Sequence, residues 1–120
     1  MADDALFIGW GAVVRGREQR ALEVFGETVA FLQEAQDAGR VQSFQPCLLQ
    51  PHGGGLAGFM LAHGERAQLD TLAASPEFAR VMARAGSIVE ELGVVRAYCG
   101  ESLAQQMGLF QEASSALAAA

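Results

Sequence analysis

The feature that most constrains the fold of this chain is the order in which two hydrophobic patterns alternate along it. Four short apolar runs have the length and composition of β-strands, at residues 5–14, 41–50, 56–63 and 94–99. Four other segments carry apolar residues at every third or fourth position, as amphipathic helices do, at residues 17–38, 66–74, 76–92 and from 102 onward. The predicted order is therefore strand, helix, strand, strand, helix pair and strand, with one helix added at the end.

Residue types at the boundaries support this order. Gly39 supplies the left-handed position that ends the first helix. Ser75 is a good N-cap for the helix that starts at Pro76, because proline is tolerated in a first turn. Glycines in residues 51–55 predict a hairpin loop, and Pro46 marks the second strand as an edge strand because proline cannot donate a ladder hydrogen bond.

This strand and helix order is the split βαβ arrangement of ferredoxin-like domains. We therefore predict an α+β fold with one domain over residues 1–120 and a core over residues 5–100. The antiparallel sheet should have the order 4-1-3-2, with its helices on one face. An added C-terminal helix is expected over residues 102–118, opened by a capping box of Ser102 and Gln105. A chain of 120 residues buries roughly two-thirds of its unfolded surface, enough for a core without metals or disulfides.

Charge and composition exclude several classes of function. The net charge of −6 argues against a general nucleic-acid partner or an anionic membrane surface. No apolar run approaches the roughly 20 residues that a membrane span requires, and the acidic start does not resemble a signal peptide. With only Cys47 and Cys99 present, we expect a cytoplasmic protein with both thiols reduced. Neither a metal nor a cofactor is predicted, since His52 and His63 should lie more than about 20 Å apart along the hairpin.

Alternation along the hairpin assigns its residues to the two sides of the sheet. A loop closed around Gly53 places Ser43 opposite His63 and Cys47 opposite Phe59. The side predicted to lie beneath the helices is apolar throughout, comprising Phe44, Pro46, Leu48, Leu56, Met60 and Ala62. Facing it on the first helix we expect the stripe of Leu22, Phe25, Val29 and Leu32.

The first and last strands are assigned from their glycines and polar residues. Because glycine lets a helix approach closely, Gly9 and Gly11 are predicted to face the helices, together with Phe7, Val13, Val95, Ala97 and Cys99. The opposite side then carries an apolar patch of Leu6, Ile8, Trp10, Phe59, Leu61, Val94 and Tyr98. Such a patch is an aggregation hazard on a monomer, so we predict that a second copy covers it in a two-fold dimer.

Polar side chains predicted among these apolar groups suggest a cleft for a small organic molecule. Trp10 and Tyr98 would form its walls, with Arg96 and His63 as polar anchors and Ser43 beside them. His63 is a candidate general base, because histidine titrates near neutral pH; alternatively it is an interface histidine bonded to Ser43. Arg96 would bind an anionic group or pair with a glutamate.

Three segments together resemble the dimeric α+β barrel superfamily, which includes the antibiotic-biosynthesis-monooxygenase-like, YCII-related and EthD-like proteins. They are Ala38-Gly39-Arg40-Val41, the glycines of residues 52–55, and Ser75-Pro76-Glu77-Phe78. The resemblance covers roughly residues 5–100 and implies a homodimer that closes a barrel. YCII-related proteins often carry a histidine where this chain has Thr28. Monooxygenase-like members act without metal or flavin and use asparagine, tryptophan or histidine, which Trp10 and His63 match loosely.

Two other motifs are weaker indications of function. Parts of a serine hydrolase are imitated by His52-Gly53-Gly54-Gly55 and by Gly100-Glu101-Ser102-Leu103-Ala104. The order of residues in those enzymes requires a histidine after the serine, but no histidine follows residue 63.

The sequence is consistent with two functions. The first is a homodimer that binds a small organic molecule in a sheet-lined cleft, with cofactor-independent chemistry as an option. The alternative is a structural or interaction dimer without a ligand pocket. Whether the protein is an enzyme is left open.

Overall fold

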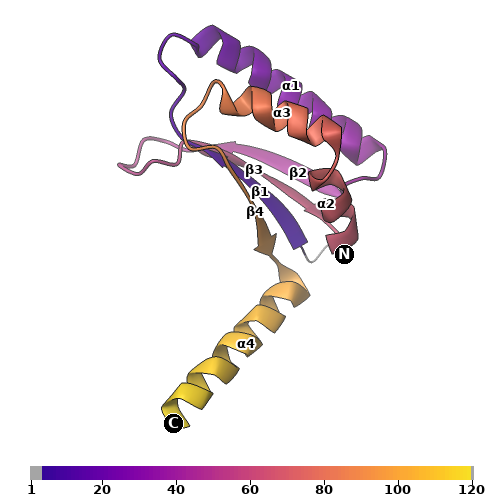
Figure 1. Ribbon diagram of the computed structural model, residues 1–120, viewed down its shortest axis with the longest axis vertical. Coiled ribbons are helices and arrows are strands. Elements are labelled where there is room, and N and C mark those ends of the chain that lie inside the picture. The colour runs from indigo at the N-terminus through magenta and orange to yellow at the C-terminus, as the bar shows by residue number, and fades with distance from the viewer. Residues whose placement is uncertain (1–3, 120) are drawn as a thin grey trace.

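A computed structural model describes residues 4–119, and its elements follow the predicted order (Figure 1). They are β1 (Asp4–Trp10), α1 (Glu18–Asp37), β2 (Ser43–Leu48), β3 (Gly58–Gly64), α2 (Arg66–Ala73), α3 (Pro76–Gly86), β4 (Gly93–Tyr98) and α4 (Gly100–Ala119). The capping signals act as expected. Gly39 adopts a φ of 74° after α1, and the Ser75 hydroxyl accepts a hydrogen bond from the Phe78 amide at the start of α3.

The four strands form one antiparallel sheet in the order β2-β3-β1-β4, which is the predicted order read from the other edge. The hairpin register is also as predicted, with Ser43 opposite His63 and Cys47 opposite Phe59. Beyond Trp10 the chain of β1 continues beside the segment that follows α3. There the Gly11 amide donates to the Glu90 carbonyl at 2.7 Å. Residues 87–92 form a turn and a bend around an isolated bridge between Val89 and Val13. Helix α3 therefore ends at Gly86 and is shorter than predicted.

Helices α1, α2 and α3 form a layer over one face of the sheet (Figure 1), which we call the helix face. Residues of this face and of the helices above it make the main core; its most buried members are Leu6, Ile8, Leu32, Val41, Met60, Ala62, Leu69 and Leu72. The buried stripe of α1 consists of Ala21, Val24, Thr28, Leu32 and Ala35. The predicted stripe was rotated from this one, because Leu22 is 70% exposed.

The assignment of faces on β1 was wrong. Leu6, Ile8 and Trp10 lie on the helix face, and the first two are only 4% and 2% exposed. The pairing of β1 with β3 places Ile8 opposite Met60, whose side was correctly predicted from the hairpin. β1 is a central strand with apolar residues on both sides, so its own pattern does not distinguish its faces.

Gly9 faces away from the helices and accommodates a ring of its own strand. A Cβ atom on Gly9 would lie 2.5 Å from Cε1 of Phe7 and 3.2 Å from Cδ1 of Leu56. The glycine thus makes room for Phe7 on the open side rather than for a helix, and Leu56 lies on that side instead of beneath the helices. Gly9 does permit a close approach, but the approaching group is the aromatic ring of Phe7.

The faces of β4 were also reversed. Arg96 pairs with Leu6, and Val94 pairs with Ile8, so both lie on the helix face, whereas Val95 is 59% exposed on the other side. A charged residue beneath helices is tolerated here because Asp70 of α2 accepts a hydrogen bond from the Arg96 guanidinium.

The opposite side of the sheet, which we call the outer sheet face, is not covered by any helix (Figure 1). It comprises Ala5, Phe7, Gly9, Ser43, Gln45, Cys47, Phe59, Leu61, His63, Val95 and Ala97. Phe7 and Phe59 stack there with ring centroids 5.3 Å apart. The prediction of an open, largely apolar sheet face therefore holds, although β1 and β4 contribute different residues to it.

Helix α4 projects from the end of β4, away from the layer of helices (Figure 1), and buries none of its residues. It begins at Gly100, two positions before the predicted start, and Gly100 takes a φ of 52° at the turn from the strand. The Ser102 hydroxyl is consequently inside the first turn rather than at its cap. Within residues 4–119 no helix combines the length and hydropathy of a membrane span.

Candidate functional site

A cavity of about 490 Å³ lies between the helix layer and the sheet, at the end where β1 reaches Trp10. Its walls come from β1, β2, β3, α1, α3 and the segment after α3. The lining residues are Ile8, Trp10, Val13, Glu18, Ala21, Leu22, Val24, Phe25, Thr28, Leu48, Met60, Met82, Ala85, Ile88, Val89 and Leu92. The volume falls in the range of about 300–1,000 Å³ that small-molecule sites occupy.

Short side chains on the two facing helices create this space. Ala21, Val24 and Thr28 form the buried stripe of α1 at this end, and Ala85 faces them from α3. At the other end the same layer is filled by Leu32, Leu69, Leu72 and Phe78, which pack together in the main core. The cavity is thus the consequence of small residues at positions where a fully packed domain carries larger ones.

The walls of the cavity offer few polar atoms. The Thr28 hydroxyl donates to the Val24 carbonyl at 2.8 Å, so its proton is already used within α1. Glu18 lies at the edge, where its carboxylate accepts from the Gly16 amide at 3.1 Å. The Trp10 ring packs edge-on against Phe25, with centroids 6.2 Å apart, and its indole N–H has no hydrogen-bond partner within residues 4–119.

Two exposed leucines stand at the rim. Leu22 of α1 is 70% exposed and Leu48 of β2 is 73% exposed, yet both line the cavity. Exposed leucines at the mouth of an apolar cavity extend its hydrophobic surface towards solvent. The arrangement can exclude water from a molecule inside and can hold that molecule by contact area.

The structure does not bring the five predicted ligand-binding residues together. Ser43 and His63 face each other on the outer sheet face, at the α2 end of the sheet. Trp10 lies on the helix face and lines the cavity. Arg96 is also on the helix face, and Tyr98, 43% exposed, ends β4 beside Asp4. A single cleft built from all five is therefore wrong, since it depended on the reversed faces of β1 and β4.

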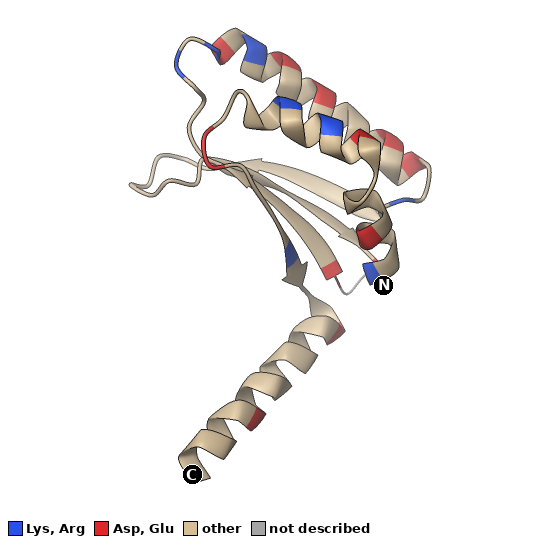
Figure 2. Cartoon of the chain, viewed as in Figure 1, with Lys and Arg blue, Asp and Glu red and all other residues tan. Residues whose placement is uncertain are grey.

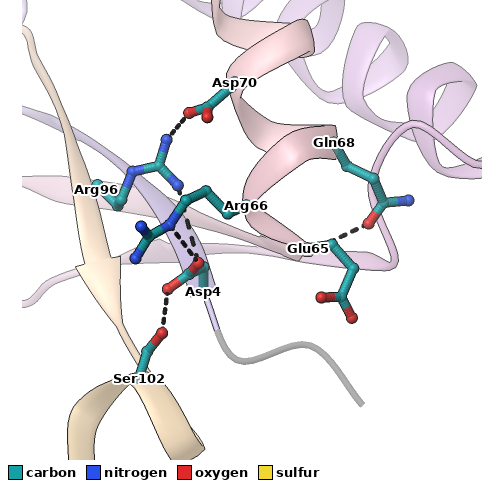
Figure 3. Close-up of polar contacts among 7 residues, drawn as sticks. All are labelled: Asp4, Glu65, Arg66, Gln68, Asp70, Arg96 and Ser102. Carbon is teal, nitrogen blue, oxygen red and sulfur yellow. Dashed lines mark hydrogen bonds and ion pairs between the residues drawn. The ribbon is translucent and has the colours of Figure 1, made fainter. Parts of the chain in front are cut away.

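Arg96 belongs instead to a polar cluster at the foot of α4 (Figure 3). It donates to Asp70, and its Nη1 atom lies 4.0 Å from Oδ2 of Asp4. That nitrogen is buried without a hydrogen-bond partner within residues 4–119. Arg66 approaches the same Asp4 oxygen at 3.5 Å, and Ser102 donates to the other one at 2.7 Å. Two arginines thus balance two aspartates, which gives Arg96 a structural partner in this chain.

Sequence reasoning missed most of the cavity. Phe25 was assigned to the core stripe of the first helix, without any indication that this residue lines a cavity. The available signal was the pairing of alanines at buried positions, Ala21 on α1 and Ala85 on α3. Volume deficits of this kind become visible only when the facing helix is known.

No metal centre is formed by the described part of the chain, residues 4–119, where no cluster of three or more His, Cys, Asp or Glu side chains is suitably arranged. Cys47 and Cys99 are free thiols. His52 sits on the hairpin loop, where its Nε2 is 2.8 Å from the Leu56 carbonyl.

Comparison with sequence-family models finds no match, and comparison with curated proteins finds none either. Solved structures do match. SnoaB, a cofactor-independent oxygenase from Streptomyces nogalater, is 18% identical with a TM-score of 0.55, and the alignment covers 85% of this chain and 98% of that one. A dimeric protein of unknown function and ferredoxin-like fold from Bacteroides fragilis is 14% identical with a TM-score of 0.55, with 79% and 95% covered.

A conserved protein from Methanosarcina mazei Go1 is 12% identical, again with a TM-score of 0.55, and the alignment covers 82% of this chain and 95% of that one. Identities at this level establish the architecture and leave the activity of this chain to its own residues. The four-stranded sheet in the order β2-β3-β1-β4, with its layer of helices, gives this protein the ferredoxin-like fold.

Proposed function

We propose that this protein is a cytoplasmic homodimer that binds a small, largely apolar organic molecule in the cavity between α1, α3 and the sheet. The observation that carries the proposal is the cavity itself, about 490 Å³ of space walled by apolar side chains in a chain that fills the other end of the same layer. Cytoplasmic location agrees with the two free thiols, which an oxidising compartment would endanger.

The walls define the chemical class of the ligand. Aromatic and aliphatic groups, including Trp10, Phe25 and Met82, favour a flat ring system held by contact area. The unpartnered indole N–H of Trp10 suits one hydrogen-bond acceptor on that ring, such as a carbonyl or phenol oxygen. An anionic ligand is disfavoured, because its charge would lose hydration in a cavity whose lining residues include the acidic Glu18 and no basic side chain.

Cofactor-independent oxygenation is the reaction we place first for this site. SnoaB, a cofactor-independent oxygenase, shares the fold over nearly its whole length. Trp10 would contact the substrate ring and orient it through its N–H. Thr28 would shape the wall without acting as a base, because its hydroxyl is bonded to the Val24 carbonyl.

The homodimer would form through the outer sheet face, which no helix of residues 4–119 covers (Figure 1). A protein of the same fold from Bacteroides fragilis is dimeric. Covering the stacked rings of Phe7 and Phe59 removes exposed aromatic surface from water. Ser43 and His63, facing each other on that surface, would then lie in the interface as a hydrogen-bonding pair. A second function, a structural dimer without ligand, would leave the cavity unused.

Ligand binding can be tested by filling the cavity. Ala85→Leu adds three carbons to the wall, whereas Ala83→Leu makes the same change on an exposed position of α3. The first probe is 1-naphthol, followed by a panel of neutral polycyclic phenols, measured by thermal shift and calorimetry. We expect the ligand to raise the melting temperature of the native protein and of Ala83→Leu. In Ala85→Leu the affinity for the ligand should be at least tenfold lower.

A panel that leaves the melting temperature unchanged in the native protein would contradict the proposed site, as would equal binding by the two variants. The oxygenase step has its own measurement. Dioxygen uptake with a bound phenol should fall in Trp10→Phe, which keeps the ring area and removes the N–H. Uptake that is unaltered by this change would remove Trp10 from the reaction.

A further inference from the structure

The shape of the molecule is set by α4. The chain measures 56 × 37 × 23 Å with a radius of gyration of 16.7 Å, whereas a compact chain of this length has a radius of about 14 Å. The excess comes from a helix of 20 residues, about 30 Å long, that extends past the end of the sheet (Figure 1). Most of the stability of a helix in a protein comes from tertiary packing of one of its faces, and α4 buries none of its residues in this chain.

The direction of α4 is determined at its first turn. The Ser102 hydroxyl donates to Asp4 at 2.7 Å, and the side chain of Asp4 is only 6% exposed. Asp4 is in turn held by Arg66 and Arg96 (Figure 3). The foot of the helix is thus bonded to β1, and through the two arginines to α2 and β4, while the rest of the helix is exposed. This geometry presents α4 as an arm with a defined base.

Most large apolar side chains of the arm lie on one side, although Leu109, which is 57% exposed, lies outside that side. Apolar side chains recur at every third or fourth position, at Leu103, Met107, Phe110 and Leu117, and all four are at least 48% exposed. We call these residues the arm stripe. The opposite side carries Glu101, Gln105 and Glu112, the two glutamates being the only charged residues of α4. The stripe requires an apolar partner surface, and no other part of the described chain provides it in this structure.

The distribution of charge distinguishes between possible partners of the arm stripe. The chain carries a net charge of −6, and its acidic residues lie mainly on the helix layer and the loops (Figure 2). Neither the arm stripe nor the outer sheet face contains an Asp, Glu, Lys or Arg residue. A strongly acidic chain can meet a copy of itself only through surfaces that keep like charges apart, and these two surfaces do so.

The area available for an interface also favours a second copy of this chain as the partner. The outer sheet face, four strands wide and six or seven residues long, covers about 400 Å² at the usual strand spacing. A stable interface buries about 800 Å² per partner, so the sheet face alone provides about half of it. One side of α4, about 30 Å long and about 10 Å wide, contributes roughly 300 Å² more.

We propose that α4 is a dimerisation arm whose stripe packs against a second copy of this chain, extending the interface of the outer sheet face. The proposal rests on the homodimer of the proposed function and is independent of the ligand cavity, which lies at the opposite end of the sheet. Each protomer supplies one arm, so a two-fold pair buries both arm stripes at once.

The first test is a matched pair of charge insertions in the full chain. Phe110→Asp places a carboxylate on the arm stripe, and Gln105→Asp places one on the opposite side of the same helix. Sedimentation equilibrium should show a dimer for the native protein and for Gln105→Asp. For Phe110→Asp we expect the dimer dissociation constant to rise by about 30-fold or more, as for loss of an interface hot spot. Equal dissociation constants for the two variants would overturn the proposal.

The second test separates packing on a partner from packing on the same chain. A photo-reactive phenylalanine analogue is placed at position 110, and equal amounts of ¹⁴N- and ¹⁵N-labelled protein are mixed, allowed to exchange and illuminated. Mixed-isotope cross-linked peptides are expected. Cross-links confined to one isotope, or a native protein that sediments as a monomer, would overturn the proposal.

The two proposals fail separately. Loss of 1-naphthol binding with an intact dimer would contradict the cavity function alone. A dimer that survives Phe110→Asp, in a protein that still binds 1-naphthol, would contradict the arm alone.

Discussion

Ser102, in the first turn of α4, donates a hydrogen bond of 2.7 Å to Oδ1 of Asp4 at the start of β1, across 98 positions of sequence. The side chain of Asp4 is 6% exposed, and its second oxygen faces Arg66 at 3.5 Å. The contact joins the two ends of the described chain and sets the angle at which α4 leaves the sheet (Figure 3).

Replacing Ser102 by alanine should destabilise the protein. The change removes a hydrogen bond to a charged, nearly buried carboxylate, and such bonds contribute about 1.5–3 kcal/mol. Urea denaturation should show a loss of this size for Ser102→Ala. Ser115→Ala, on an exposed position of the same helix, should change stability by less than about 0.5 kcal/mol. A similar, small change for both variants would show that Asp4 is satisfied without Ser102.

Gly9→Ala should disturb the outer sheet face. The new Cβ atom would lie 2.5 Å from Cε1 of Phe7, so the ring must move and its stacking on Phe59 must change. We expect a loss of about 1–3 kcal/mol in the free energy of unfolding, as for other overpacked sites, together with weaker dimerisation. Gly108→Ala, where nothing lies within 4 Å of the new atom, is the control and should stabilise by about 0.5–1 kcal/mol as a substitution inside a helix. An unchanged dimer and unchanged stability for Gly9→Ala would contradict this packing.

Gly26→Ala should stabilise the protein. Gly26 lies inside α1, and a Cβ atom there has nothing within 4 Å. Alanine in a helix interior is favoured over glycine by about 0.5–1 kcal/mol, because it loses less backbone entropy on folding. The same substitution at Gly39, where φ is +74°, should instead destabilise by about 1–2 kcal/mol. Chemical denaturation of the two variants should therefore give changes of opposite sign.

Glu27 of α1 and Arg84 of α3 form a bidentate ion pair, with both N–O distances at 2.8 Å. The pair links the two helices that cover the cavity. The two side chains are 47% and 53% exposed, so solvent screens the attraction and we expect a coupling of less than about 1 kcal/mol. A double-mutant cycle of Glu27→Gln and Arg84→Gln measures it, at low and at high salt. A coupling above this limit, or one that does not weaken with salt, would show that the pair is more shielded than its exposure indicates.

Local chemistry was sufficient to predict the elements and most of their boundaries. Ser75 before Pro76, and Gly39 after a helical pattern, act through the backbone of a few neighbouring residues, so their effect can be inferred without the rest of the fold. The hairpin register followed from loop closure near Gly53 in the same way. The strand order then followed because few topologies accept this succession of elements.

The residues of the candidate site could not be predicted from local sequence patterns. Leu6, Ile8 and Trp10 are as apolar as Phe7 and its neighbours, so either side of β1 could have faced the helices until pairing with Met60 decided it. Arg96 lies beneath helices only because Asp70 of α2 is there to accept its hydrogen bond.

The sequence by itself determined the kinds of element, their order, the hairpin register and the need to cover an apolar sheet face. Only the tertiary structure decided which residues form that face, where α4 points, and that the small side chains of Ala21 and Ala85 line a cavity. The physical reason is the separation in sequence over which each interaction acts. Caps, turns and periodicity act between residues a few positions apart, whereas the choice of a face and the volume of a cavity depend on side chains that meet only after distant segments have packed together.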